Sequence, residues 1–442
     1  MYKKLRAPIM VQVEIIGDCT QCCCHCYNFW RNRAGKLEVF GNKSLDPKRI
    51  PSLVNCLHEV KVFKTLITGG EPLTCFGVLV DLLKQARQKG LWVGINSNLV
   101  LMTQEKAEIV RNLGVDHILT SILGPNAEVH DCISGRDGMF IKLLGGIRNA
   151  RDAGIKVTAN MVVSKINRKE VRETARLVQS LGVKSFTATK AGCPGNCSDF
   201  SHLRLDRDEL VQMFNDLLWA KETLGLKIDT LEPVPFCTLA KTDNPEPFMS
   251  RRCCAGVTSL TISYDGSVRP CSHLDVSYGN LFQENMSSIW SRMNPWTAGQ
   301  FIPEKCRVCE FVVACAGGCR MEAKTFRDNL CALDPYAFPS EIKECEVPLR
   351  KALTNLHGQK SFNESNRFVC KPFKAREESF GGIVMTEFEK TVVLSKKGLQ
   401  IVMSLQPGTV YSIDGSSIDW KGLNAASFVR GLVNNDFAKY EL

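Results

Sequence analysis

The sequence contains no long run of apolar residues. No stretch approaches the roughly 18 residues that a membrane-spanning helix requires. Near the N-terminus, Glu14 and Asp18 interrupt what would have to be the apolar region of a secretory signal peptide. We therefore expect a cytoplasmic protein that does not bind a membrane.

The chain also lacks a strong excess of one charge. It has 56 Lys and Arg against 46 Asp and Glu, which leaves a formal net charge of +10 over 442 residues. This moderate excess permits an acidic partner but does not require nucleic acid, and we expect no nucleic-acid partner.

Cysteine, in contrast, is abundant, with 21 residues. Five of them lie between Cys19 and Cys26, and a second group lies between Cys253 and Cys331. Disulfide frameworks suit small exported domains, whereas clustered thiols in a long chain without an export signal more often bind metal. The composition therefore predicts an iron–sulfur protein.

The first half of the sequence alternates β-rich runs with amphipathic stretches of helical period. Such strands pair in parallel through crossover connections, so we expect an α/β fold with a partial (β/α)6 TIM-like barrel and its chemistry at the carboxyl ends of the strands. A doubly wound open sheet is the alternative. The predicted strands are Met10–Ile16, Lys64–Thr68, Leu91–Asn96, His117–Ile122, Ile155–Val163 and Lys184–Thr189, and the predicted helices span about 47–62, 74–89, 103–113, 139–153 and 168–182.

Changes in composition divide the chain into four parts. We predict the barrel over 1–204, a helical bridge over 205–250, a cysteine-rich domain over 251–350 and, after a polar linker at 357–370, a small α+β module over 371–442. The cysteine-rich part has few periodic stretches, so we expect bound metal, more than apolar burial, to hold it together.

The first cysteine group contains the spacing C-x3-C-x2-C, just after the first predicted strand. Cys19, Cys23 and Cys26 fit this spacing, and Cys22 and Cys24 are interpreted as bystanders. Three thiolates on a short loop can hold three irons of a [4Fe–4S] cluster and leave the fourth iron open. A structural zinc, which takes four ligands, is the alternative.

These cysteines, the following Tyr27 and the tetrapeptide Gly69-Gly70-Glu71-Pro72 after the second strand resemble the radical SAM superfamily. The resemblance implies that the open iron binds S-adenosylmethionine (SAM) and that the Gly-Gly-Glu-Pro edge contacts the SAM amino group. Glycines allow close backbone approach, and Glu71 can accept from an ammonium. Further SAM-contact candidates at later strand ends are Ser97, Asn98, Ser121 and Asn160.

The second cysteine group is similar to the SPASM domain, an auxiliary-cluster extension of radical SAM enzymes. Its array runs C-x11-G-x4-C and then C-x2-C-x5-C-x3-C. The resemblance implies two auxiliary [4Fe–4S] clusters, one on Cys254, Cys271 and Cys319 and one on Cys306, Cys309, Cys315 and a final cysteine.

Two ligands of this second group stay open. The family places the final cysteine shortly after an Asp-Pro, but here Asp334-Pro335-Tyr336 leads to Ala337. We choose Cys331 over Cys345, and Cys253 could replace Cys254. A pair of zinc ribbons is the alternative to the two clusters.

Residues 373–438 resemble the small winged-helix-like domains that recognise leader peptides in peptide-maturation enzymes. Such a module would add an extended leader as a strand to its sheet edge. The alternative is a dimerisation or stabilising appendage.

Together, these resemblances imply an enzyme that cleaves SAM reductively to a 5′-deoxyadenosyl radical and removes a hydrogen atom from a ribosomally made precursor peptide. They imply three [4Fe–4S] clusters and an external reductant such as flavodoxin or ferredoxin, and they assign no catalytic side chain. Cross-linking, excision, epimerisation and decarboxylation all fit this chemistry. Alternatives are sulfatase-maturase-like oxidation of a protein residue, and a non-catalytic electron-transfer or iron–sulfur or zinc-binding protein.

Overall fold

The structure, a computed structural model, describes residues 2–28, 43–115, 117–193, 200–342, 349–352, 367–386, 391–414, 417–435 and 437–440. The chain forms two compact units, Met1–Leu356 and His357–Leu442. None of the described helices is both long enough and apolar enough to cross a membrane.

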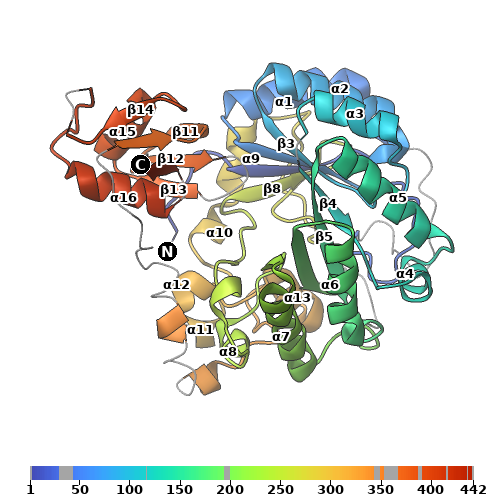
Figure 1. The fold of residues 1–442 in the computed structure, drawn as a ribbon. Helices are drawn as coiled ribbons and strands as arrows, with labels where there is room; N and C mark the ends of the chain where they lie inside the picture. The colour runs from blue at the N-terminus through green and yellow to red at the C-terminus, as the bar shows by residue number, and fades with distance from the viewer. Residues whose placement is uncertain are drawn as a thin grey trace. The chain divides into compact units, whose positions relative to one another are not determined.

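The first unit is built on one nine-stranded sheet with the strand order β7-β6-β5-β4-β3-β2-β1-β8-β9 (Figure 1). Strands β1 to β6 are parallel neighbours in chain order. Because the order does not reverse among them, the doubly wound alternative is wrong and the partial barrel is confirmed. Their bounds are Met10–Glu14, Lys64–Thr68, Trp92–Asn96, His117–Ser121, Lys156–Val163 and Ser185–Lys190.

Three further strands extend this sheet beyond the six that the sequence predicts. β7 (Lys227–Asp229) pairs in parallel with β6, and β8 (Ser259–Ile262) pairs in parallel with β1. β9 (Val268–Arg269) then pairs antiparallel with β8. The cysteine-rich part therefore continues the barrel sheet.

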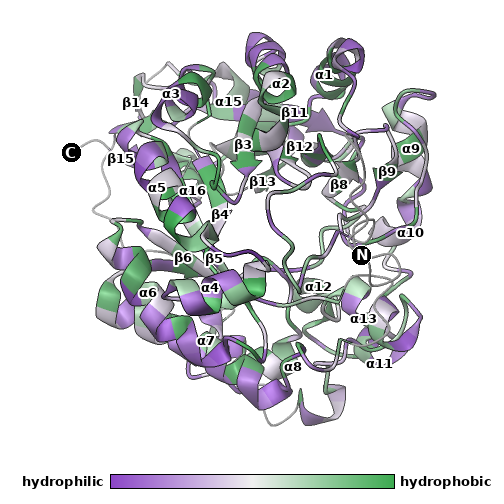
Figure 2. Ribbon diagram, turned by 90° about the vertical axis from the view of Figure 1, so that its right-hand side faces the viewer, coloured by the Kyte–Doolittle hydropathy of each residue, from purple (hydrophilic) through white to green (hydrophobic). Residues whose placement is uncertain are grey.

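Helices cover the outer side of the barrel strands (Figure 1). In Figure 2 the strands are mostly hydrophobic, whereas the surrounding helices turn hydrophilic faces outward. The helices are α1 (Ile50–Glu59), α2 (Phe76–Gln88), α3 (Gln104–Asn112), α4 (Ala127–Ser134), α5 (Met139–Asp152), α6 (Val171–Ser180) and α7 (Arg207–Leu224). Sequence periodicity misses α4 and locates α1, α2, α3, α5 and α6 within a few residues, whereas α7 covers only the first part of the predicted helical bridge.

The cysteine-rich part contains short helices, several of only four residues. It is anchored to the barrel by buried polar contacts: Glu14 of β1 accepts from Arg269 and, at 2.7 Å, from Ser263, and the Trp290 indole donates to the Leu5 carbonyl at 2.9 Å. Its helices are α9 (Met286–Arg292), α10 (Asn294–Thr297), α11 (Glu304–Arg307), α12 (Val312–Cys315) and α13 (Arg320–Arg327), and α8 (Phe236–Leu239) precedes it in the predicted bridge.

The second unit consists of small sheets and helices. One three-stranded sheet has the order β14-β10-β15 and the other β11-β12-β13, both antiparallel. Phe368, Val384, Ile401 and Val429 belong to one buried apolar cluster. β10 lies within the segment predicted as a linker. The elements are β10 (Arg367–Cys370), β11 (Phe373–Glu378), β12 (Gly381–Thr386), β13 (Thr391–Leu394), α15 (Lys396–Ser404), β14 (Val410–Ser412), α16 (Ala425–Asn434) and β15 (Ala438–Tyr440).

Candidate functional site

The cysteine loop, Cys19–Cys26, follows the carboxyl end of β1 and rests on the end of α4. The Cys22 N–H donates to the Ser134 carbonyl at 2.8 Å, and the Cys24 N–H donates to the Ile133 carbonyl at 3.1 Å. A further bond, from Cys26 N–H to the Cys23 carbonyl at 3.1 Å, folds the loop back on itself. The loop is therefore shaped by its own backbone and by one neighbouring helix.

The Gly69-Gly70 edge lies directly against the start of this loop. The Gly70 N–H donates to the Ile16 carbonyl and the Glu71 N–H donates to the Asp18 carbonyl, both at 2.7 Å. A Cβ added at Gly70 would lie 2.0 Å from the Asp18 oxygen. Only glycine permits this approach, so the pair of glycines joins the end of β2 to the cysteine loop.

Glu71 is fully buried and its carboxylate is held by protein donors. Oε1 accepts from the Leu73 N–H at 3.0 Å and the Ser97 hydroxyl at 2.7 Å, and Oε2 accepts from the Asn98 N–H at 2.7 Å. Burial raises the pKa of Glu71, and these donors oppose the rise. The side chain thus ties the ends of β2 and β3 together. Its contact with a SAM amino group stays a prediction.

Of the remaining predicted SAM-contact residues, Ser97 and Asn98 follow β3, Ser121 ends β4 and Asn160 lies within β5. The Asn98 amide donates to the Thr20 hydroxyl at 2.9 Å and lies 3.7 Å from the Cys19 sulfur. Ser121, the last residue of β4, is in register with Asn160, whose Oδ1 accepts from two threonine hydroxyls of β6. All these residues therefore lie at the same edge of the sheet as the cysteine loop.

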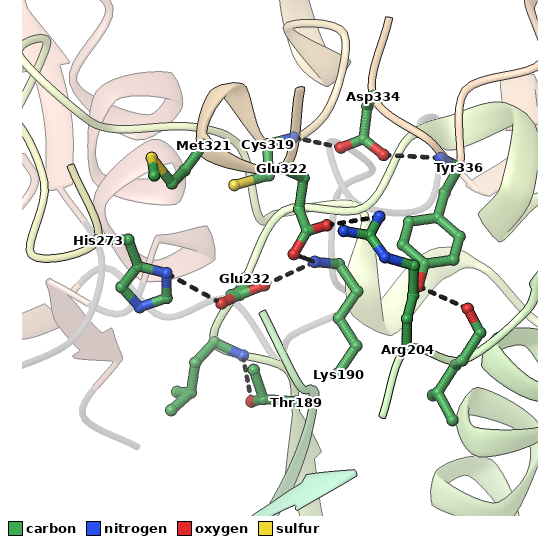
Figure 3. Close-up of polar contacts among 12 residues, drawn as sticks. Thr189, Lys190, Arg204, Glu232, His273, Cys319, Met321, Glu322, Asp334 and Tyr336 are labelled. Atoms are coloured by element: carbon green, nitrogen blue, oxygen red, sulfur yellow. Dashed lines mark hydrogen bonds and ion pairs between the residues drawn. The ribbon is translucent and has the colours of Figure 1, made fainter. Parts of the chain in front are cut away.

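A buried ionic network lies at the end of β6 (Figure 3). The Lys190 ammonium is 2.7 Å from Glu232 and 3.0 Å from Glu322, and its side chain is 1% exposed. Arg204 lies 3.3 Å from Glu322. Although burial favours the neutral amine, the two carboxylates raise the pKa of Lys190 well above its ordinary value. Sequence reasoning missed this network because Glu232 and Glu322 are distant from Lys190 in the chain.

His273 connects this network to the cysteine loop. Its Nδ1 lies 3.6 Å from Glu232, and its ring stacks on Tyr27 with centroids 4.4 Å apart. Burial lowers the pKa of His273, and the Glu232 carboxylate opposes that shift. The stack brings the residue after Cys26 beside the segment that carries Cys271.

The two predicted auxiliary ligand sets are brought together to different degrees. Burial is the main cause that raises the pKa of the Cys271 thiol to about 12, and Cys253 contributes to this rise. Cys253 also raises the pKa of Cys319, after larger effects of burial and Glu232. Cys254 instead is exposed, with its thiol 3.3 Å from the Arg252 carbonyl. Cys253 therefore interacts electrostatically with both other members of the first set.

The second auxiliary set gathers around one cavity. Cys306, Cys309 and Cys315 line it together. Cys331 does not line it: this residue is exposed, and its sulfur lies 3.7 Å from the Gln300 carbonyl. Cys345 lies outside the described residues.

Comparisons with known proteins agree with this geometry. Residues 13–178 match the family model of the radical SAM superfamily, and residues 253–310 match SPASM, an iron–sulfur cluster-binding domain. The chain carries a radical SAM domain and a SPASM domain. SAM and iron–sulfur clusters are the cofactors that these domains imply, and the loop thiols and the glycine edge fit them.

Curated relatives of this radical SAM chain include an AdoMet-dependent heme synthase of Nitratidesulfovibrio vulgaris, 27% identical over 344 residues, covering 74% of this chain and 91% of the relative. A PqqA peptide cyclase of Gluconobacter oxydans is 26% identical, covering 74% and 92%. The subtilosin biosynthesis protein AlbA of Bacillus subtilis is 25% identical, covering 74% and 71%.

Solved structures show the same fold. The AdoMet-bound structure of anSMEcpe has a TM-score of 0.61 at 16% identity and covers 80% of this chain and 100% of its own. Streptococcus suis SuiB bound to the precursor peptide SuiA also has a TM-score of 0.61 at 16% identity, covering 76% and 77%.

Proposed function

We propose that this radical SAM enzyme modifies a precursor peptide. The single observation that carries the proposal is that the cysteine loop, the glycine edge and the SPASM segment meet at the carboxyl edge of one sheet. The names of the PqqA peptide cyclase and of the subtilosin protein AlbA support the peptide as substrate class.

The residues have separate roles in this proposal. Cys19, Cys23 and Cys26 hold a cluster with one open iron, and the backbone at Gly69–Gly70 borders the SAM amino group. Ser97 and Glu71 fix that border, because their hydrogen bonds tie β2 to β3. Bound to the reduced cluster, SAM supplies a 5′-deoxyadenosyl radical that abstracts hydrogen.

The SPASM segment holds two auxiliary clusters in this proposal, which makes three in all. For the first we propose Cys271 and Cys319 as ligands, together with Cys254 or its less exposed neighbour Cys253. An external reductant such as a flavodoxin or ferredoxin supplies the electron.

Anaerobic reconstitution tests the cofactor part. Three four-iron clusters require about twelve irons per chain, and reduction should then release 5′-deoxyadenosine from SAM. Stoichiometric zinc without brown absorbance would contradict the iron–sulfur assignment. A mass change in a co-expressed precursor peptide, absent without SAM, tests the substrate class.

The second unit, 357–442, is proposed to hold the leader of that peptide. Its sheets have edge strands, to which an extended leader can add a strand. Fluorescence anisotropy with a labelled precursor compares the full chain with a chain ending at residue 356. We expect truncation to weaken peptide binding at least tenfold while SAM cleavage without peptide is retained, because remote binding raises the effective concentration of the core peptide. Unchanged affinity would make the unit a structural appendage.

A second candidate function is heme synthesis, since three curated relatives are named AdoMet-dependent heme synthases. Incubating the reconstituted enzyme with a tetrapyrrole heme precursor and following heme absorbance distinguishes the two candidates. Heme formation without any peptide change would favour this second function.

A further inference from the structure

The cavity that gathers the second auxiliary set has a fourth thiol on its wall. Cys237 lines it together with Cys306, Cys309 and Cys315. Three of these thiols are buried, and Cys309 is partly buried. Phe236 and Phe311 also line the cavity, so apolar rings contribute to its lining.

Cys237 comes from a different part of the chain than the other three cysteines. It lies on α8, in the segment that the sequence predicts as a helical bridge, whereas Cys306 lies on α11 and Cys315 ends α12. The neighbouring Phe236 N–H donates to the Cys315 sulfur at 3.4 Å. This bond fixes the first turn of α8 against α12, and the Cys237 thiol therefore stays at the cavity.

The Cys237 sulfur also has a backbone donor of its own. The Phe338 N–H donates to it at 3.1 Å. Backbone N–H groups directed at cysteine sulfurs stabilise the negative charge that thiolates carry as iron ligands. The sulfur atoms of Cys237 and Cys315 therefore each accept from one such backbone donor.

Residue 337, which precedes Phe338, lies at the same cavity but carries no thiol. Ala337 lines the same cavity, and it occupies the place where the resemblance predicts the final cysteine. A methyl group cannot bind iron. Cys237, which precedes the other three cysteines in the chain, also lines this cavity and brings a thiol to it. Cys331, in contrast, is exposed and does not line the cavity.

We infer that Cys237 is the fourth ligand of the auxiliary cluster held by Cys306, Cys309 and Cys315. The inference deepens the proposed function and rests on its iron–sulfur assignment. A cluster with four cysteine ligands has no open iron. This auxiliary cluster therefore transfers electrons and does not bind substrate directly, in contrast to the cluster on the cysteine loop.

The test isolates auxiliary iron from the iron of the cysteine loop. In a parent chain with Cys19, Cys23 and Cys26 all changed to Ala, anaerobic reconstitution should leave about eight irons per chain, as two four-iron clusters require. Adding Cys237→Ala should lower this to about four, or convert one cluster to a three-iron form with its own EPR spectrum.

Control variants exclude the competing ligands and simple burial effects. Cys331→Ala, Cys345→Ala and Cys193→Ala should each keep the iron content and EPR spectrum of the parent. Cys193 matches Cys237 in burial, since both are 6% exposed, but it is outside the cavity. Hydrogen exchange of β1–β6 should be the same in Cys237→Ala and the parent, which shows that the barrel is folded.

The outcomes separate this inference from the proposed function. A parent chain that contains zinc and no iron would contradict the proposed iron–sulfur chemistry as a whole. A parent with about eight irons whose content and spectrum are unchanged by Cys237→Ala would overturn the assignment of Cys237 alone. Iron loss in Cys345→Ala or Cys331→Ala, but not in Cys237→Ala, would overturn it in favour of that cysteine.

Discussion

The cysteine loop and the auxiliary cavity both gather thiols, but they do so by different means. The loop takes its three cysteines from eight consecutive positions after β1, and its shape depends on backbone bonds to α4 and to the glycine edge. The cavity takes Cys306, Cys309 and Cys315 from one segment and Cys237 from α8.

The difference shows where spacing is informative. Ligands on one short loop stay together whatever the rest of the chain does, so their spacing identifies them. Ligands from distant parts of the chain are identified instead by the contacts that hold their segments together in the folded structure. In the cavity these contacts are the Phe236 and Phe338 N–H groups directed at sulfur.

The largest expected effect tests the register of the loop. Cys23→Ala should lower SAM cleavage by more than roughly 100-fold, because removing a ligand should exceed the 10–100-fold cost typical of its outer-shell partners. Cys22→Ala should leave SAM cleavage nearly unchanged. The measurement is 5′-deoxyadenosine released by the reduced, reconstituted enzyme. Equal losses in both variants would show that spacing misassigns the ligands even on a local loop.

Breaking the network beside Cys319 should be the next largest effect. Lys190→Met leaves Glu232 buried without its ammonium partner and should destabilise the chain by about 3–5 kcal/mol. The control Lys241→Met removes a 40% exposed ammonium that lies 3.7 Å from Glu341 and should cost less than about 1 kcal/mol. Urea denaturation of the cluster-free proteins compares them. Similar losses of stability in the two variants would mean that the ion pair between Lys190 and Glu232 contributes little to the stability of the chain.

The pH dependence of the same network follows from Glu232. Burial tends to raise its pKa, but the Lys190 ammonium lowers it below the ordinary value of a glutamate. A lowered pKa contributes stability that is complete above about pH 4.5 and is lost as the pH falls through the folded-state pKa. The stability difference between the cluster-free wild type and Glu232→Gln should therefore shrink in urea titrations below that pH. A constant difference down to about pH 3 would contradict the ion pair.

The smallest expected effect concerns the hydrogen bond between Ser97 and Glu71, beside the cysteine loop. Ser97→Ala removes one donor from the buried Glu71 carboxylate and should cost about 1.5–3 kcal/mol, together with weaker SAM binding. Ser180→Ala, which removes an exposed helix hydroxyl, should change stability by less than about 0.5 kcal/mol. Denaturation and SAM titration measure both variants. An equal, small change in both would mean that Ser97 does not position the SAM border.

The amino-acid sequence by itself determined the parallel barrel and the cysteine loop. Hydrophobic period and strand–helix alternation are local properties, and they located β2 at Lys64–Thr68 without error. The tertiary structure alone decided the sheet extension through β7 to β9, the Lys190 network and the place of Cys237 at the auxiliary cavity. Each depends on residues that are distant in the chain, and only packing brings such residues together, because no local periodicity or spacing records which distant side chain will fill a given space.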